Sequence, residues 1–92
     1  MPKKLGKYRD DDIELCRTTN RRVSSEAVQA LLEERIPFTK NHKKIPFYKR
    51  EQYQGASELW VISTSPRRYG QARRVIDRME QVYRDRLVLS NF

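Results

Sequence analysis

The sequence contains few of the residues that build covalent or metal-bound scaffolds. Its 92 residues include one cysteine, Cys16, and one histidine, His42. A single cysteine excludes an internal disulfide and suits a reducing cytoplasm. Metal sites need several His, Cys or acidic ligands at matched spacing, and the sequence shows no such set. No apolar run approaches the roughly 18–20 residues of a membrane span, and no apolar stretch follows the basic residues near Met1. We therefore expect a cytoplasmic protein without a cofactor and without a membrane partner.

Signatures of catalysis are also scarce. The three glycines form neither a phosphate-binding loop nor a nucleophile elbow. Cys16 would act as a nucleophile only beside a base, and a small buried strand residue is the simpler interpretation. The acidic run at residues 10–12 lacks a second acidic element that would hold Mg²⁺. The sequence predicts a protein that is not an enzyme.

Positive charge is what the sequence has in excess. It contains 20 Lys and Arg against 12 Asp and Glu, which gives a net charge of +8 and a pI of about 10.0. Residues 36–74 carry a net +7, whereas residues 10–35 carry a net −3. We expect residues 1–12 to form a flexible arm and residues 13–92 to form a single domain. The basic middle segment is the place to look for a polyanion site.

Hydrophobic periodicity predicts two helices separated by short strands. Ser24 is a suitable N-cap for a helix over residues 24–35, which Pro37 ends. Ser65 and Pro66 are a standard opening for a second helix, whose apolar positions recur up to Tyr83. Strand patterns occur at residues 13–18, 38–40, 45–48, 58–62 and 87–89, with a turn expected at residues 41–44.

The resulting order βαββαβ predicts an α+β protein with a ferredoxin-like arrangement, an antiparallel sheet with two helices on one face. In that topology the turn after the first strand lies near the tip of the hairpin over residues 40–55. Arg21 and Arg22 are then expected near the tip, and Arg67 and Arg68 at the opposite end of the sheet.

One face of the predicted sheet has no helix over it. If Leu59 and Val61 pack under the helices, Trp60 and Ile62 face the other way; the reverse assignment fits as well, because both faces of that strand are apolar. A terminal segment would shield the uncovered side chains, or Trp60 and Ile62 would form a homodimer interface. Both alternatives remain open.

The hairpin mixes basic and aromatic side chains. Basic groups neutralise phosphates and aromatic rings stack on unpaired bases, so this mixture is typical of single-stranded nucleic-acid binding. A solvated basic loop with its rings folded onto the core is the alternative. Phe47 and Tyr53 accompany the predicted binding residues, which are Lys40, Lys43, Lys44, Tyr48, Lys49 and Arg50.

A second anion site is predicted where the second helix begins. The N-terminus of a helix offers unpaired N–H groups and partial positive charge, and arginine grips phosphate in bidentate fashion. Ser65, Arg67 and Arg68 would form this site. A helix start without a ligand is the alternative.

From these patterns we expect a non-enzymatic binding module that engages a polyanion, with nucleic acid as the first choice of partner. A small regulatory or protein-interaction domain is the alternative, in which the charge serves solubility or an acidic protein partner.

Three stretches resemble a known family. They are Ser25-Glu-Ala-Val-Gln-Ala-Leu-Leu-Glu-Glu-Arg-Ile-Pro-Phe38, then Leu59-Trp60-Val61, then Gln71-Ala-Arg-Arg-Val-Ile76. Together they resemble small prokaryotic signal-transducing domains of ferredoxin-like fold, distantly similar to the PII nitrogen-regulatory proteins. The resemblance spans roughly residues 13–80 and implies the fold, but no ligand residues can be transferred from it. Arg35 stands where that family tends to place a helix-ending glycine.

Overall fold

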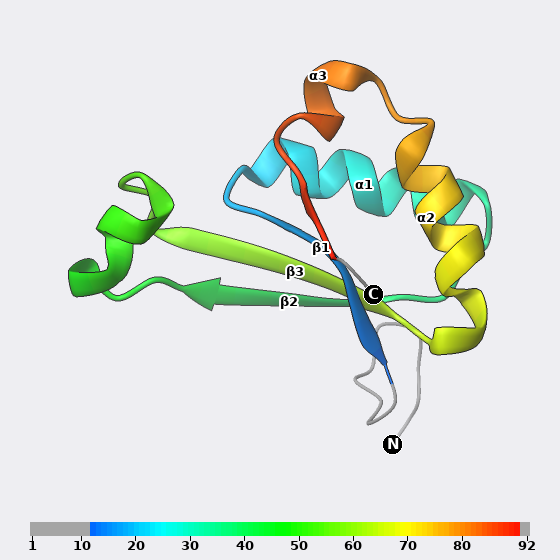
Figure 1. The fold of residues 1–92 in the computed structure, drawn as a ribbon, viewed down its shortest axis with the longest axis horizontal. Coiled ribbons are helices and arrows are strands. Elements are labelled where there is room, and N and C mark those ends of the chain that lie inside the picture. Colours follow the sequence, from blue (N-terminus) through cyan, green and yellow to red (C-terminus); the bar gives the residue numbers. More distant parts are fainter. Residues whose placement is uncertain (1–11, 91–92) are drawn as a thin grey trace.

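The fold is a four-stranded sheet with helices on one face, seen in a computed structural model that describes residues 12–90 (Figure 1). The strands are β1 (Ile13–Thr18), β2 (Thr39–Lys44), β3 (Glu58–Thr64) and β4 (Val88–Leu89). The helices are α1 (Arg21–Glu33), α2 (Tyr69–Asp77) and α3 (Gln81–Arg84), with 3₁₀ segments η1 (Phe47–Tyr53) and η2 (Pro66–Arg68). All strand pairs are antiparallel, in the order β2-β3-β1-β4. The expected α+β class is confirmed.

The main core lies between the sheet and the helices. Ile62 of β3 is 0 % exposed and packs in one cluster with Leu31 of α1 and Ile76 of α2. The register of β1 against β3 shifts between Glu14 and Cys16. This irregularity lets the consecutive residues Leu15 and Cys16 both enter the core, where strict alternation would expose one of them.

A second, smaller core covers the other face of the hairpin formed by β2 and β3. Leu59 and Val61 of β3 pack with Ile45, and Tyr53 and Ala56 lie against them. Both apolar faces of β3 are therefore buried within one chain. The segment between β2 and β3 covers Leu59 and Val61 with Ile45, Tyr53 and Ala56.

This second core corrects the residues expected at a dimer interface. Ile62 faces the helices, and Trp60, two residues away in the same strand, lies on the same face and is 6 % exposed. Leu59 and Val61 therefore face away from the helices, and Ile62 faces toward them. Trp60 and Ile62 are not exposed for contact with a second copy of the chain. Self-association stays a prediction, now without those two side chains to carry it.

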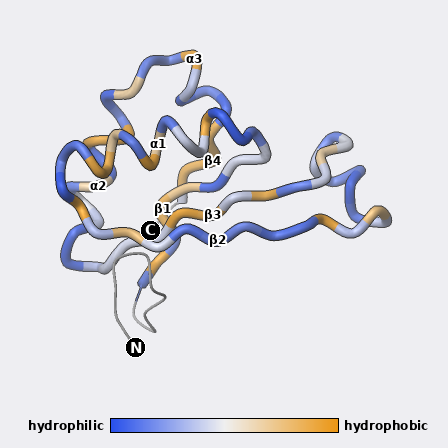
Figure 2. The backbone as a smooth tube through the Cα atoms, turned by 180° about the vertical axis from the view of Figure 1, so that it is seen from behind, coloured by the Kyte–Doolittle hydropathy of each residue, from blue (hydrophilic) through white to orange (hydrophobic). Residues whose placement is uncertain are grey.

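The hairpin itself differs from its prediction. Residues 41–44, expected as a turn, continue β2, and residues 45–48 leave the sheet and enter η1. All residues of β2 after Thr39 are exposed, and the strand is hydrophilic along its length (Figure 2). An edge strand with no apolar face lacks the period-two signal, so its polar residues have the same pattern as a turn.

The second predicted helix is divided into three pieces. Ser65 and Pro66 do open it, but as the 3₁₀ segment η2, and α2 ends at Asp77. Glu80 has an extended backbone, and α3 starts after it and lies against α1. Met79 and Tyr83 both pack on the main core. The helical spacing of apolar residues therefore continues from α2 into α3, although the chain bends between the two helices.

Two side-chain hydrogen bonds close one end of the sheet. The Thr64 hydroxyl donates to the carbonyl of Pro37 at 2.9 Å, which joins the end of β3 to the segment after α1. The Thr39 hydroxyl donates to Asp12 at 2.8 Å. Residues 1–11 of the predicted arm lie outside the described residues. Within residues 12–90, no helix has the length and apolar character needed to cross a membrane.

Helix α1 begins three residues before the predicted start. Asn20 is the N-cap, and its side-chain oxygen accepts from the Val23 N–H at 3.1 Å. Ser24, the predicted cap, lies inside the helix, where its buried hydroxyl has no hydrogen-bond partner among the described residues. Both residue types are good caps, so local preference could not choose between them.

Substitution of the two residues distinguishes these caps. Asn20→Ala is expected to lower the free energy of unfolding by about 1 kcal/mol, because it removes a helix cap. Ser24→Ala is expected to leave stability unchanged or raise it by up to about 1 kcal/mol, because it removes an unsatisfied buried hydroxyl. Urea unfolding measures both; an equal loss in the two variants would contradict the cap at Asn20.

Helix α1 ends with a non-glycine residue in the left-handed region. Arg35 has φ 59°, its N–H donates to the Leu32 carbonyl at 3.0 Å, and the Ile36 N–H donates to the Leu31 carbonyl at 3.0 Å. This bonding pattern is a Schellman motif, which normally places glycine at that position. Arginine adopts it here at a conformational cost.

Relief of that cost is testable. Arg35→Gly is expected to raise the free energy of unfolding by about 0.5–1 kcal/mol, because glycine adopts positive φ without steric penalty. Arg35→Ala is the matched control, since it removes the same charge near the helix C-terminus but retains Cβ. Urea unfolding of both variants checks the expectation, and a gain no larger for glycine than for alanine would refute it.

Candidate nucleic-acid interface

The hairpin of β2 and β3 extends beyond the helical layer and carries η1 at its outer end (Figure 1). Its basic side chains alternate between the faces of β2: Lys43 stands opposite Leu59, and Lys44 opposite Glu58. Lys40 is exposed further back along the strand, opposite Ile62. Lys40 and Lys44 therefore lie on one face of β2 and Lys43 on the other, with Lys43 and Lys44 nearest the outer end.

Two aromatic rings stand in solvent where η1 begins. Phe47 is 78 % exposed and Tyr48 is 71 % exposed, which makes them the most exposed large hydrophobic residues of the described chain. Their ring centroids lie 5.8 Å apart in an edge-on arrangement, with an interplanar angle of 85°. The alternative in which these rings fold onto the core is excluded by their exposure. We call the set Lys43, Lys44, Phe47, Tyr48 and Lys49 the hairpin tip.

Arg50 and Tyr53 have a different role from the tip residues. The Arg50 guanidinium donates to the Ile45 carbonyl at 3.1 Å, which ties η1 to the end of β2. Tyr53 packs on the second core, and the chain then turns through Gln54 at φ 59° and Gly55 at φ 88°. Arg50, predicted to bind the ligand, thus holds the loop that presents the exposed rings.

The single histidine is fixed within the hairpin. His42 stacks on Trp60 with ring centroids 5.0 Å apart, and its Nε2 lies 3.6 Å from a Glu58 carboxylate oxygen. This packing gives His42 a place in the hairpin's architecture. Across residues 12–90, His, Cys, Asp and Glu side chains form no group of three that could hold a metal ion.

The second predicted anion site lies at the other end of β3. The seven residues of that strand span about 20 Å, so Ser65, Arg67 and Arg68 are not brought together with the hairpin tip. Ser65 makes no side-chain cap, and the Arg68 guanidinium donates to the Gln71 amide oxygen at 2.9 Å. Only the three-residue η2 follows Ser65 directly, and α2 has Arg68 as its N-cap.

A partly exposed arginine–carboxylate pair lies on β1. Arg17 donates two hydrogen bonds to the Glu14 carboxylate, both at 2.7 Å. The bonds from Arg17 lower the pKa of Glu14, and the same bonds raise the pKa of Arg17. This pairing offsets the charge of Arg17 within β1.

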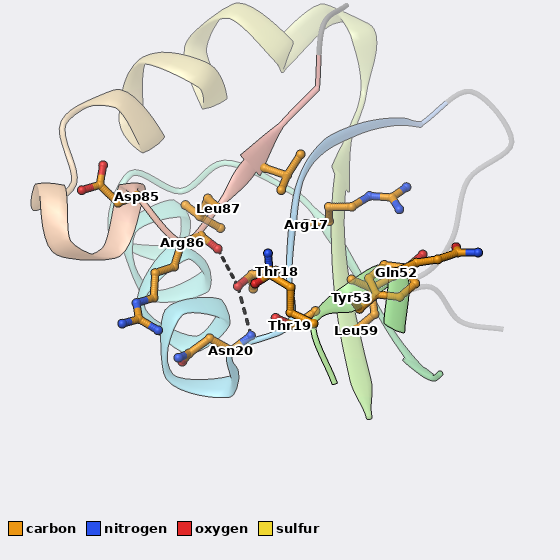
Figure 3. A pocket seen from close by; sticks show the side chains of 12 residues that line it. Arg17, Thr18, Thr19, Asn20, Gln52, Tyr53, Leu59, Asp85, Arg86 and Leu87 are labelled. Atoms are coloured by element: carbon orange, nitrogen blue, oxygen red, sulfur yellow. Dashed lines mark hydrogen bonds between the residues drawn. The ribbon is translucent and has the colours of Figure 1, made fainter. Parts of the chain in front are cut away.

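A groove lies between η1 and the body of the protein (Figure 3). No sequence pattern predicted it. Its volume is about 610 Å³. Three segments far apart in sequence meet there: the turn after β1, the end of η1, and the approach to β4. We call it the η1 groove; its lining residues are Arg17, Thr18, Thr19, Asn20, Gln52, Tyr53, Gln54, Leu59, Asp85, Arg86, Leu87 and Val88. The turn after β1 was expected near the tip of the hairpin over residues 40–55; in the structure it lies across the groove from the end of η1, at Gln52, Tyr53 and Gln54.

Cys16 is enclosed in the main core at 0 % exposure. Burial raises the pKa of its thiol to about 12, with a smaller contribution from the Glu14 carboxylate. A thiol in this state supplies no thiolate at neutral pH. The predicted structural role of Cys16 as a small strand residue agrees with its position.

Thiol reactivity tests the burial of Cys16. At about pH 8 we expect a thiol reagent to label the native protein only as fast as it unfolds, and the urea-unfolded protein at once.

The stability of the protein should also depend on the ionisation of Cys16. Since the folded-state pKa exceeds the ordinary value, stability is unaffected by Cys16 below about pH 9 and falls as pH rises toward 12. The loss at about pH 10 should be about 1 kcal/mol.

Cys16→Ala is the control, because any remaining pH dependence in that variant comes from other groups. Rapid labelling of the native protein, or the same alkaline loss of stability in Cys16→Ala, would contradict the enclosed thiol.

The chain matches none of the protein-family models, curated proteins or solved structures with which it was compared. The resemblance to small signal-transducing domains therefore stays a prediction.

Proposed function

We propose that this chain is a non-enzymatic module that binds single-stranded nucleic acid through its hairpin tip. The observation that carries the proposal is the exposed pair of rings, Phe47 and Tyr48, at the outer end of a lysine-rich hairpin. Burying such rings in water-free contact is favourable, and bases offer the flat faces that match them.

The arrangement favours unpaired bases over a duplex. A base inside a double helix keeps its faces stacked on its neighbours, so exposed rings can reach only bases that are free of pairing. The edge-on geometry of Phe47 and Tyr48 presents two ring faces in different directions. Each can take a separate base, and the neighbouring lysines can follow the phosphates between them.

Two contacts within the hairpin hold η1 in place and so support this role. Tyr53 anchors η1 on the second core, and the Arg50 hydrogen bond fixes η1 to β2. A segment whose backbone is held in place loses little conformational freedom on binding, which leaves more of the contact energy for affinity. The resulting site is a rigid projection rather than a cleft.

We also propose that the domain is ferredoxin-like. Its support is the element order, with β1 and β2 joined through α1 and β3 and β4 joined through α2 and α3. In each case the two joined strands are separated in the sheet by one other strand. Split βαβ units of this kind define that arrangement. The division of the second helix is the departure from it.

Ring removal tests the proposed function. Phe47→Ala and Tyr48→Ala are each expected to weaken binding of a labelled single-stranded oligonucleotide by about tenfold or more, because stacking contributes about 1–3 kcal/mol per base. Fluorescence anisotropy measures the dissociation constants. Tyr48→Phe should retain most of the affinity, because it keeps the ring.

Val82→Ala is the matched control for loss of an exposed apolar side chain. Val82 is 61 % exposed on α3, outside the hairpin, and its truncation should leave affinity unchanged. Equal effects of Phe47→Ala and Val82→Ala, or no oligonucleotide binding at low salt, would overturn the proposal.

Charge removal separates the two ends of the molecule within the same assay. Lys44→Ala with Lys49→Ala should reduce the slope of log affinity against log salt by about 1.4, since each phosphate contact on a single strand contributes about 0.7. Arg67→Ala with Arg68→Ala removes the same charge at the opposite end of β3 and should leave that slope nearly unchanged. A reversed result would move the interface to η2.

A further inference from the structure

The η1 groove contains polar groups that the fold does not use. The side-chain amides of Gln52 and Gln54 make no hydrogen bond to any residue in 12–90. Asn20 uses only its side-chain oxygen, as the cap of α1, so its amide N–H₂ remains available. These amides can both donate and accept, which is the capability needed at the edge of a nucleobase.

The groove has an aromatic and apolar side next to those amides. Tyr53 is half-buried, with part of its ring on the second core, and Leu59 lies beside it as part of the floor (Figure 3). Leu87 supplies buried apolar surface from the segment before β4. A flat apolar ligand can contact this side without losing hydrogen bonds.

The opposite side contains one arginine, one carboxylate and the start of α1. Asn20 begins α1 there, and the first turn of that helix contains Arg21 and Arg22 but no acidic residue. Arg86 lines the groove on the same side (Figure 3). Among the described residues, none of these three guanidiniums is in an ion pair. Asp85 is the one carboxylate in the lining. Arg86 is the one of these three arginines in the groove lining, and it favours an anionic group on this side together with the dipole of α1.

The geometry points to a nucleotide-binding subsite in the η1 groove. We propose that it takes one nucleotide of a single strand, with the base against Tyr53 and the phosphate beside Arg86 and the start of α1. This assignment rests on the proposed function, and it names a second contact point for the same ligand. The groove reads the edge of a base, which the exposed rings of the tip cannot do.

The distance between the hairpin tip and the η1 groove suits one continuous single-stranded nucleic acid. Tyr48 and Tyr53 lie five residues apart in η1, which corresponds to about 10 Å at the rise of a 3₁₀ helix. A strand stacked on Phe47 and Tyr48 therefore needs to continue by only a few nucleotides to reach the groove. The lysines of the tip lie at the start of that path.

Titration with ribonucleoside 5′-monophosphates tests the subsite independently of the tip. At about 10 mM nucleotide, a site with a dissociation constant of about 1 mM is mostly filled. We expect NMR shifts in the side-chain amides of Asn20, Gln52 and Gln54 of the full chain. Inorganic phosphate at the same concentration should shift Asn20 less and leave Gln52 and Gln54 unmoved, because it lacks a base.

Arg86→Ala should weaken nucleotide binding about tenfold, and Gln52→Ala should weaken it for some bases more than for others. Arg74→Ala is the matched control: Arg74 is exposed on α2 and lies outside the groove lining. Equal losses in Arg86→Ala and Arg74→Ala would overturn the subsite. So would equal amide shifts from inorganic phosphate and from the nucleotides.

The two proposals fail in different ways. Absence of amide shifts at about 10 mM nucleotide, with oligonucleotide binding still dependent on Phe47 and Tyr48, would overturn the subsite and leave the tip as the interface. Amide shifts that persist while the tip variants bind oligonucleotide normally would overturn the proposed function and support the groove as a site for a nucleotide.

Discussion

Strand β3 packs apolar side chains on both of its faces, and each face holds a different part of the molecule. Ile62 joins the sheet to α1 and α2, whereas Leu59 and Val61 hold the returning loop through Tyr53. At about 25 cal/mol per Å², burial on both faces is the main term that keeps the hairpin extended and its loop folded back. The exposed rings and the η1 groove exist because that loop is held. A strand buried on one face only would have left a sheet surface open and a loop free to move.

The distribution of charge has meaning only in relation to this strand. The basic residues of the middle segment are divided between its two ends, separated by about the length of β3. At one end they accompany exposed aromatic rings; at the other, Arg68 is bound to Gln71 within the helix start. Arg17 is already paired with Glu14, so its charge is not offered to a ligand. Of the net charge of +8, only the lysines of the hairpin tip lie beside the exposed aromatic rings.

Local rules predicted the elements better than their boundaries or contacts. The strand over residues 58–62 and the existence of the first helix were recognisable because apolar spacing acts within a few residues. The helix end was not, because α1 stops at Glu33 with Arg35 in the left-handed region, before Pro37 is reached. The start of α1 was not, because Asn20 and Ser24 are both good caps and the choice depends on burial of Ser24 in the finished core. The basic and aromatic residues of the hairpin were also recognisable. Which of them face solvent was not, since Phe47 and Tyr53 look alike in sequence and differ only in what packs against them.

The sequence by itself determined the α+β class, the basic middle segment and the candidate residues of the hairpin, because these follow from composition and short-range periodicity. Only the tertiary structure decided which face of β3 meets the helices, since both faces are apolar and a period of two cannot rank them. It also decided that Arg50 holds a loop, that Trp60 lies under His42, and that three distant segments meet in one groove. Those outcomes depend on contacts between residues far apart in the chain, which no local pattern encodes.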